Sequence, residues 1–159
     1  MHVTPDTLDE LTARARSSPR RRHHLLLHAS QNEPCQRMVI AMEPDSYIQP
    51  HRHPDSTTNE ALLALRGAFA LIVFDDVGEV ADVRKLGVEC DVAVAELEPH
   101  VWHTVLALEA GAVLFEAKSG PFRQEAAKRF APWAPSEDAP EAEDYLRQLF
   151  LRASSALGT

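Results

Sequence analysis

Three histidines and one glutamate supply side chains of the kind that bind transition metals. His51 and His53 lie one residue apart in "PHRHP", and His103 lies in "VWHTVLAL". Successive side chains of a strand point to opposite faces, so His51 and His53 share one face and Arg52 takes the other. Two imidazoles on an inward face are costly to bury unless their nitrogens are used, and a metal ion is the simplest user. Together with Glu60 they form a nitrogen and oxygen set suited to one divalent transition ion, such as Fe, Mn, Ni, Zn or Cu.

Each of these side chains also has an ordinary structural role that competes with the metal. A lone histidine beside apolar residues is usually a core or surface residue, and we assign that role to His2, His28 and His100. A glutamate at the start of a strand is usually solvated. The shared face of His51 and His53 favours the metal over these roles.

The segment from 35 to 122 has the pattern of a protein built from short strands. Stretches such as "CQRMVIAM", "EALLALRG", "AFALIVF" and "AVLFEAKSG" are rich in Val, Ile, Leu and Phe, and turn signals such as "EPD", "DDVGEV" and "EAGA" separate them. This spacing predicts an all-β sandwich or barrel. Both faces of "AFALIVF" are apolar, so we expect a facing sheet on one side and a helix or a second subunit on the other.

Helical segments flank the predicted sandwich. Thr4 is a candidate N-cap, Pro5 fits the first helical position, and the helix is predicted to run to residue 16. Residues 20–30 fit a short strand or a linker, and a second helix is predicted over residues 140–156, after a proline-rich hinge. We therefore divide the chain into an N-terminal helical arm (1–34), the β domain (35–122) and a C-terminal helical extension packed on the barrel (123–159).

Composition argues against several classes of function. The net charge of -8 is the opposite of the basic surface that nucleic-acid binders present. No apolar run approaches the ~20 residues of a membrane span, and the polar N-terminus lacks the apolar core of a signal peptide. Cys35 and Cys90 are not clustered and fit free thiols in a reducing compartment. We expect a cytoplasmic protein that binds neither nucleic acid nor membrane.

The metal-binding residues are spaced in a way that resembles the two signatures of the cupin superfamily. The first signature has two histidines one residue apart, then a glutamate and a glycine, and here matches His51, His53, Glu60 and Gly67. The second has a proline shortly before a histidine, and here matches Pro99 and His103. In cupins the three histidines and the glutamate ligate one metal inside a small jelly-roll barrel. The resemblance implies that fold and that ligand set for this chain.

The chain departs from the first signature in the length of one gap. Six residues, "PDSTTN", separate His53 from Glu60, which is longer than usual in cupins. Asp55, inside this gap, is therefore an alternative oxygen ligand.

A narrower resemblance covers most of the chain. The segments "QRMVIAMEPDSYIQPHRH", "FDDVGEV", "WHTVLAL", "EAKSGPF" and "FAPWAPSED" together are similar to the WbuC family of cupin-fold metalloproteins. Members of that family often occur in bacterial gene clusters for surface polysaccharides (O-antigen). The resemblance implies a metal and a sugar-related setting, and it leaves the reaction open.

Five further polar residues are candidates for a substrate pocket. If "YIQPHRH" is one continuous strand, Tyr47 and Gln49 face the same way as the two histidines. Glu116 and Lys118 share a face of the last predicted strand, either as an outward solvated pair or as an inward pair that binds substrate or exchanges a proton. Arg37, in the first strand of the β domain, is a candidate for binding substrate charge.

Two functions of different class follow from these residues. The first is a metal-dependent enzyme acting on a small molecule, such as a sugar or sugar nucleotide, through isomerisation or epimerisation or, with iron, through oxygen chemistry. The second is a non-catalytic module in which the metal holds a ligand or braces the barrel. We also expect a homodimer through an outer sheet face.

Overall fold

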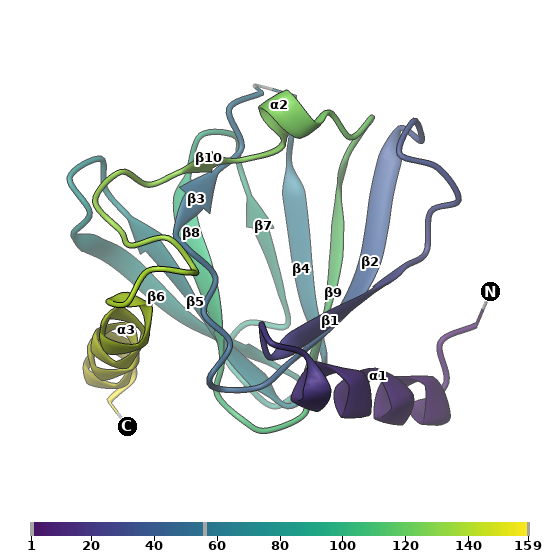
Figure 1. The fold of residues 1–159 in the computed structure, drawn as a ribbon, viewed down its shortest axis with the longest axis horizontal. Coiled ribbons are helices and arrows are strands. Elements are labelled where there is room, and N and C mark those ends of the chain that lie inside the picture. The colour runs from purple at the N-terminus through teal and green to yellow at the C-terminus, as the bar shows by residue number, and fades with distance from the viewer. Residues whose placement is uncertain (1, 56, 159) are drawn as a thin grey trace.

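Two five-stranded antiparallel sheets face each other in the computed structural model, which describes residues 2–55 and 57–158 (Figure 1). The first sheet has the order β1 (Arg22–Leu26), β2 (Cys35–Met42), β9 (Ala112–Ser119), β4 (Glu60–Arg66) and β7 (Val94–Leu97). The second has the order β10 (Arg129–Phe130), β3 (His51–Arg52), β8 (Trp102–Ala107), β5 (Ala68–Phe74) and β6 (Val80–Gly87). The helices are α1 (Pro5–Ser17), α2 (Gln124–Ala127) and α3 (Ala142–Leu157). The predicted jelly-roll β-sandwich with flanking helices is confirmed.

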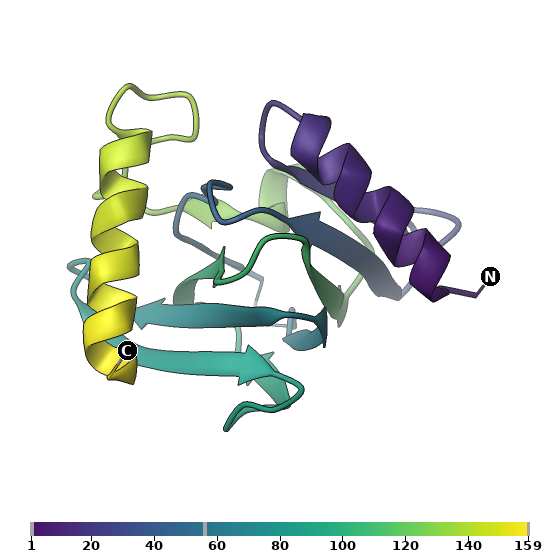
Figure 2. The ribbon, with the colours of Figure 1, turned by 90° about the horizontal axis from the view of Figure 1, so that it is seen from below.

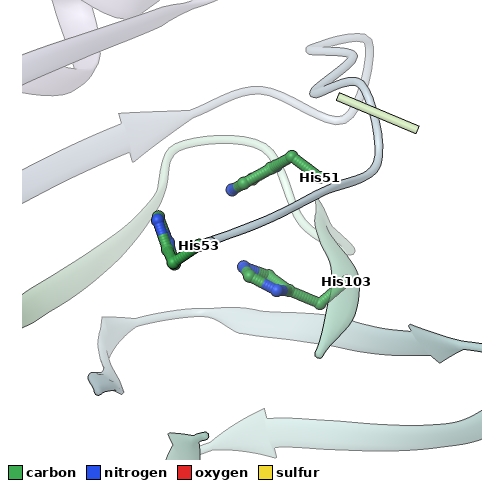
Figure 3. A group of neighbouring side chains, drawn as sticks. All are labelled: His51, His53 and His103. Carbon is green, nitrogen blue, oxygen red and sulfur yellow. The ribbon is translucent and has the colours of Figure 1, made fainter. Parts of the chain in front are cut away.

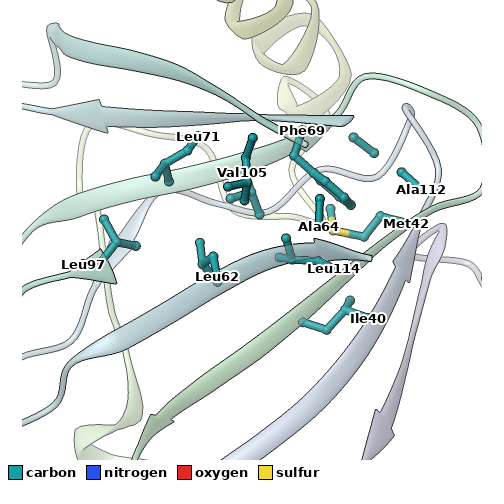
Figure 4. Close-up of a cluster of buried hydrophobic side chains, with 12 residues drawn as sticks. Ile40, Met42, Leu62, Ala64, Phe69, Leu71, Leu97, Val105, Ala112 and Leu114 are labelled. Carbon is teal, nitrogen blue, oxygen red and sulfur yellow. The ribbon is translucent and has the colours of Figure 1, made fainter. Parts of the chain in front are cut away.

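The main hydrophobic core lies between the two sheets. Every second residue of a strand points inward, so β4 contributes Leu62 and Ala64 while β5 contributes Phe69 and Leu71 from the other sheet (Figure 4). These side chains are at most 4% exposed. This packed interior fixes the distance between the sheets, and therefore the positions of polar side chains that share the same inward faces.

Helix α1 covers part of the outer face of the first sheet. It begins as predicted, with the Thr4 side chain accepting a hydrogen bond from the backbone N–H of Thr7 and with Pro5 at the first helical position. Its narrow apolar side, with Leu11 and Ala15 buried, packs on the outward side chains of the sheet. The outward side chains in this contact are Val39, Ala41 and Val113.

Helix α3 covers the outer face of β5 on the opposite side of the molecule (Figure 2). Its buried residues Leu146 and Leu149 belong to the same apolar cluster as Ala70 and Ile72 of the strand. The two apolar faces of "AFALIVF" are thus explained by the core on one side and by a helix on the other. A second subunit is not needed to cover this strand.

The sandwich takes one strand from each flanking segment, so it extends beyond the predicted range of 35–122. Strand β1, within the predicted helical arm, pairs antiparallel with β2, and β10, within the predicted extension, pairs with β3. Both are edge strands, where one neighbour supplies all the backbone partners, and such short pairings leave little periodicity in the sequence. None of the described helices is both long and apolar enough to span a membrane.

Candidate metal centre

Three buried imidazoles converge on one point between the sheets, as predicted. His51 of β3 lies directly opposite His103 of β8 in the strand pairing, and His53 follows one residue after the end of β3. One ring nitrogen from each histidine lies within 4.8 Å of the other two, and each residue is 4% exposed. Figure 3 shows the rings pointing toward one another. This is the geometry of a ligand cluster, and the H-x-H spacing on a shared face produces it.

Backbone carbonyls hold all three rings in the same tautomer. The Nδ1 atoms of His51, His53 and His103 lie 3.0, 2.5 and 2.9 Å from the carbonyl oxygens of Gln49, Ala127 and Val101, respectively. A carbonyl oxygen can only accept a hydrogen bond, so each Nδ1 must carry the proton. Each Nε2 is then left with a free lone pair. Nε2 is the atom that binds a metal when Nδ1 is held by a hydrogen bond in this way.

Glu60 brings the carboxylate to the cluster from β4 in the facing sheet. It is 3% exposed, and its Oε2 lies 3.2 Å from Nε2 of His53 and 3.1 Å from Nε2 of His103. A carboxylate oxygen and two Nε2 lone pairs repel one another unless a cation lies between them, either a proton or a metal ion. Three imidazole nitrogens and one carboxylate fit a divalent transition ion. The residues present therefore fit the metal that the sequence predicts.

The electrostatics of the cluster favour the forms that bind a metal. Burial lowers the pKa of His51 well below its ordinary value, and the nearby charges of Lys128 and His103 lower it further. Burial alone would raise the pKa of Glu60, but without a metal ion, hydrogen bonds from protonated Nε2 of His103 and His53 outweigh it and hold that pKa well below its usual range; a metal ion would take the place of those protons. At neutral pH the cluster thus presents a neutral His51 and an ionised Glu60.

Asp55, the alternative oxygen ligand, lies elsewhere. It is exposed, and its Oδ1 accepts hydrogen bonds from the backbone and side chain of Thr57. After the long gap that follows His53, Glu60 begins β4 in the other sheet, opposite Lys118. Of the two candidate oxygen ligands, only Glu60 contacts the histidines.

A cavity of about 400 Å³ adjoins the cluster between the sheets. His51, His103 and Glu60 form part of its wall. Most of the remaining wall is apolar and comes from Met38, Ile40, Met42, Ile48, Leu62, Val105, Leu114, Phe122 and Phe130. A ligand in this cavity would lie directly beside the imidazoles.

Glu116 and Lys118 point into this cavity rather than to solvent. Lys118 Nζ lies 2.8 Å from Glu116 Oε1, and both side chains are 10% exposed. Burial lowers the pKa of Lys118, but the charges of Glu116 and Glu60 outweigh it and raise that pKa overall. Burial and the charge of Glu60 raise the pKa of Glu116. The inward reading of this pair is therefore the one the structure supports.

Tyr47 and Gln49 do not line the cavity, and the prediction that they do is wrong. It assumed one continuous strand from Tyr47 to His53, whereas the chain is irregular up to Pro50 and the strand begins at His51. Proline has no N–H for strand pairing, so the alternation of faces does not continue across it. The Tyr47 hydroxyl donates to the carbonyl of Pro135 at 2.8 Å, and Gln49 Nε2 donates to the carbonyls of Ala131 and Ala134 at 3.3 and 3.1 Å.

Arg37 also lies outside the cavity. On β2 the inward residues are Met38, Ile40 and Met42, so Arg37 takes the opposite face by strand alternation. Its guanidinium forms an ion pair with Glu33. Arg37 is therefore not placed to bind the charge of a ligand in this cavity.

Sequence reasoning missed four basic residues of the cavity wall, Arg20, Arg22, His24 and Lys128. Arg22 is 6% exposed, lies 2.5 Å from Glu137 in an ion pair, and donates to the carbonyl of Tyr47 at 2.8 Å. Burial lowers the pKa of His24 to about 4, with a further contribution from the charge of Arg22. The alternation of Arg22 and His24 is visible in "RHHLL". Which face of β1 points inward depends on its pairing with β2, and the local sequence pattern does not reveal that pairing.

Comparison with solved structures shows which proteins have this architecture. A cupin 2 domain-containing protein from Halorhodospira halophila has a TM-score of 0.54 and 15% identity, over 82% of this chain and 81% of that one. KdgF from Halomonas sp. has a TM-score of 0.51 and 16% identity, over 68% and 86%. Oxalate decarboxylase from Bacillus subtilis has a TM-score of 0.50 and 14% identity, over 69% and 27%. At these identities the likeness shows a shared fold, the cupin-type jelly roll.

Sequence comparison gives one family. The profile of a family described as "Domain of unknown function (DUF6016)" matches residues 3–86. No curated protein matches the chain significantly.

Proposed function

Because this chain belongs to the DUF6016 family, whose description assigns no activity, we propose its function from the site: a metal-dependent cupin enzyme that acts on a small molecule. The observation that carries the proposal is the set of three Nε2 lone pairs, each fixed by a carbonyl at Nδ1, facing a buried carboxylate. A cluster of acceptors this deep in a protein needs a cation, and the donor types select a divalent transition ion such as Fe, Mn, Ni or Zn.

The side chains around the cluster suit proton transfer on a substrate held beside it. A bound divalent ion would supply Lewis-acid polarisation of a carbonyl or hydroxyl oxygen or, if it is iron, oxygen activation. Glu116, whose pKa is raised by burial, can hold a proton at its carboxyl group, and Lys118 lies against it as a charged partner. The apolar side chains of the wall offer a surface on which the carbon atoms of a substrate can pack. This arrangement supports isomerisation or epimerisation.

The substrate setting comes from sequence resemblance. The segments similar to the WbuC family support a role in bacterial surface-polysaccharide assembly, with a sugar or sugar nucleotide as substrate. Of two structurally similar proteins, oxalate decarboxylase is named for a reaction, whereas the name KdgF states none. Fold alone does not choose a reaction.

A non-catalytic metal module is the second candidate, and one observation favours it. All four donors are at most 4% exposed, as in a closed structural site. Addition of azide to the Co²⁺-loaded protein separates the two functions. A change in the visible absorption spectrum indicates an open coordination position and supports catalysis, whereas an unchanged spectrum supports a structural metal.

Elemental analysis of protein purified without added metal tests the metal itself. We expect about one transition ion per chain, and we expect His53→Ala to lose most of it while circular dichroism still shows the β-sandwich, since the core between the sheets does not include this ring. His2→Ala, which changes an exposed histidine far from the cluster in sequence, is the control. Stoichiometric metal in the protein carrying both His51→Ala and His53→Ala would place the site elsewhere.

A further inference from the structure

Two lysines from distant parts of the chain reach the cavity beside the histidine cluster. Lys118 comes from β9 in the first sheet, and Lys128 comes from the short connection between α2 and β10. The remaining lysine, Lys85, lies on β6 and is not part of this wall. In a chain of net charge -8, two of the three lysines therefore line one cavity.

The other charged basic groups of the wall have acidic partners, while His24 is neutral. Arg20 and Arg22 pair with Glu137 at 3.9 and 2.5 Å, and Lys118 pairs with Glu116 at 2.8 Å. The ammonium of Lys128 has no carboxylate within 4 Å among the residues whose side chains the structure describes. Burial of the ammonium lowers the pKa of Lys128, and the charges of Glu116 and Glu60 act in the opposite direction without outweighing it. Lys128 thus lines the cavity as a cation with no ion-pair partner among the side chains that the structure describes.

Lys128 lines the same cavity as part of the histidine cluster. His51, His103 and Glu60 belong to the wall of this cavity of about 400 Å³, and so does Lys128. Ile48 and Phe130 are among the apolar side chains of the same wall. A ligand that fills the cavity can therefore contact the lysine, the apolar side chains and the cluster together.

We propose that this cavity binds a small organic anion, whose charged group is held by Lys128 with Lys118 beside it and whose remaining atoms pack on the apolar wall. The inference rests on the proposed function, because it assigns the substrate class of the same site. A carboxylate or a phosphate would supply a direct ion-pair partner for Lys128, held by a charge-assisted hydrogen bond from its ammonium. The apolar wall favours an anion with an alkyl portion over one that carries a hydroxyl on every carbon.

Calorimetric titration with hexanoate tests the charged group, and hexanamide, which has the same shape without the charge, is the matched probe. We expect hexanoate to bind at least about tenfold more tightly than hexanamide, and Lys128→Gln to weaken hexanoate by about tenfold or more without affecting hexanamide. Lys85→Gln, which removes the same charge outside the cavity, should leave both affinities unchanged. Lys128→Arg should retain most of the affinity because it keeps the charge.

Glucuronate, titrated in parallel, separates two kinds of anion. The apolar wall predicts weaker binding of glucuronate than of hexanoate. A preference for glucuronate with the same loss in Lys128→Gln would support the anion site and assign it to a sugar acid. Equal effects of Lys128→Gln and Lys85→Gln on both anions, or no binding of either anion to the wild type, would overturn the inference.

The titrations are done on metal-loaded and metal-free protein, so that the two proposals fail separately. Hexanoate binding that depends on the metal and is insensitive to Lys128 overturns the lysine anchor and leaves the metal centre standing. Lys128-dependent binding in a protein that takes up no metal supports the anion site and refutes the metal-dependent function. Thermal unfolding of each variant confirms that it is folded.

Discussion

Single histidines in this protein have different chemistry because their surroundings differ. His51 and His103 have one ring nitrogen fixed by a carbonyl and the other directed at the cluster. His24 lines the same cavity but has no place in the cluster, and burial keeps it neutral. The carbonyl contact at Nδ1, and not burial alone, thus distinguishes the candidate metal ligands His51 and His103 from His24.

The low pKa of His24 predicts how stability depends on pH. In the unfolded chain this ring takes up a proton near pH 6.5, whereas in the folded protein it does so only near pH 4. Between these values the unfolded state binds more protons, so the free energy of unfolding falls as the pH is lowered. We expect His24 to contribute about 1–2 kcal/mol of the stability lost between pH 7 and pH 5.

Urea unfolding of metal-free protein at the two pH values measures this loss. His24→Gln, which cannot titrate, should lose less stability than the wild type over the same interval. NMR titration of the His24 ring gives its pKa directly. A ring that titrates near pH 6.5 in the folded protein, or equal losses in the two proteins, would contradict the prediction.

At the scale of elements, β3 shows both how far the sequence predicts the site and where the prediction stops. His51 and His53 were placed correctly because alternation along an extended chain is local. Tyr47 and Gln49 were misplaced because Pro50 interrupts that alternation. Glu60 from β4 and Lys128 from beside β10 reach the cavity because each strand pairs within its own sheet and the two sheets face each other. The cupin resemblance supplied Glu60, and nothing local indicated Lys128.

The irregular segment before β3, which contains Tyr47 and Gln49, forms hydrogen bonds with residues 131–135, in the connection that leads to α3. The hydroxyl of Tyr47 donates to the carbonyl of Pro135, away from the cavity. Tyr47→Phe should therefore lower the free energy of unfolding by about 1 kcal/mol, because it removes one hydrogen bond and leaves a carbonyl without its donor. Metal content and hexanoate affinity should not change. Denaturant unfolding and elemental analysis measure the two effects.

Tyr145→Phe is the matched control for this substitution. The two tyrosine rings pack edge to face at 5.9 Å, and the hydroxyl of Tyr145 has no hydrogen-bond partner among the described residues. Its removal should change stability by less than about 0.5 kcal/mol. A loss of metal or of anion binding in Tyr47→Phe would restore Tyr47 to the cavity.

At the scale of the whole molecule, helix α1 leaves part of one outer sheet face uncovered. The helix contacts β1, β2 and β9. Beyond it, Leu63 of β4 lies opposite Val94 of β7, and Val94 is 59% exposed while Leu65 is 36% exposed. Exposed apolar side chains on neighbouring strands are the kind of surface that a second copy of a chain covers in a two-fold dimer.

We expect the homodimer to form through this face. Light scattering after gel filtration should give a mass of twice 17.6 kDa. Val94→Arg places a charge at the centre of the face and should shift the protein to the monomer, whereas Val77→Arg, at a 75% exposed position in the turn between β5 and β6, should not. A monomeric wild type at high protein concentration would rule the dimer out.

The carbonyl of Ala127, which fixes the tautomer of His53, lies 74 residues further along the chain. All three histidines therefore leave the ribosome well before that carbonyl does, and β3 has to wait for β10 to be synthesised before the two can pair. Until then no carbonyl fixes the tautomer of His53. We therefore expect the proposed metal to bind tightly only after synthesis of the chain, so that the ion is selected from those available to the finished protein.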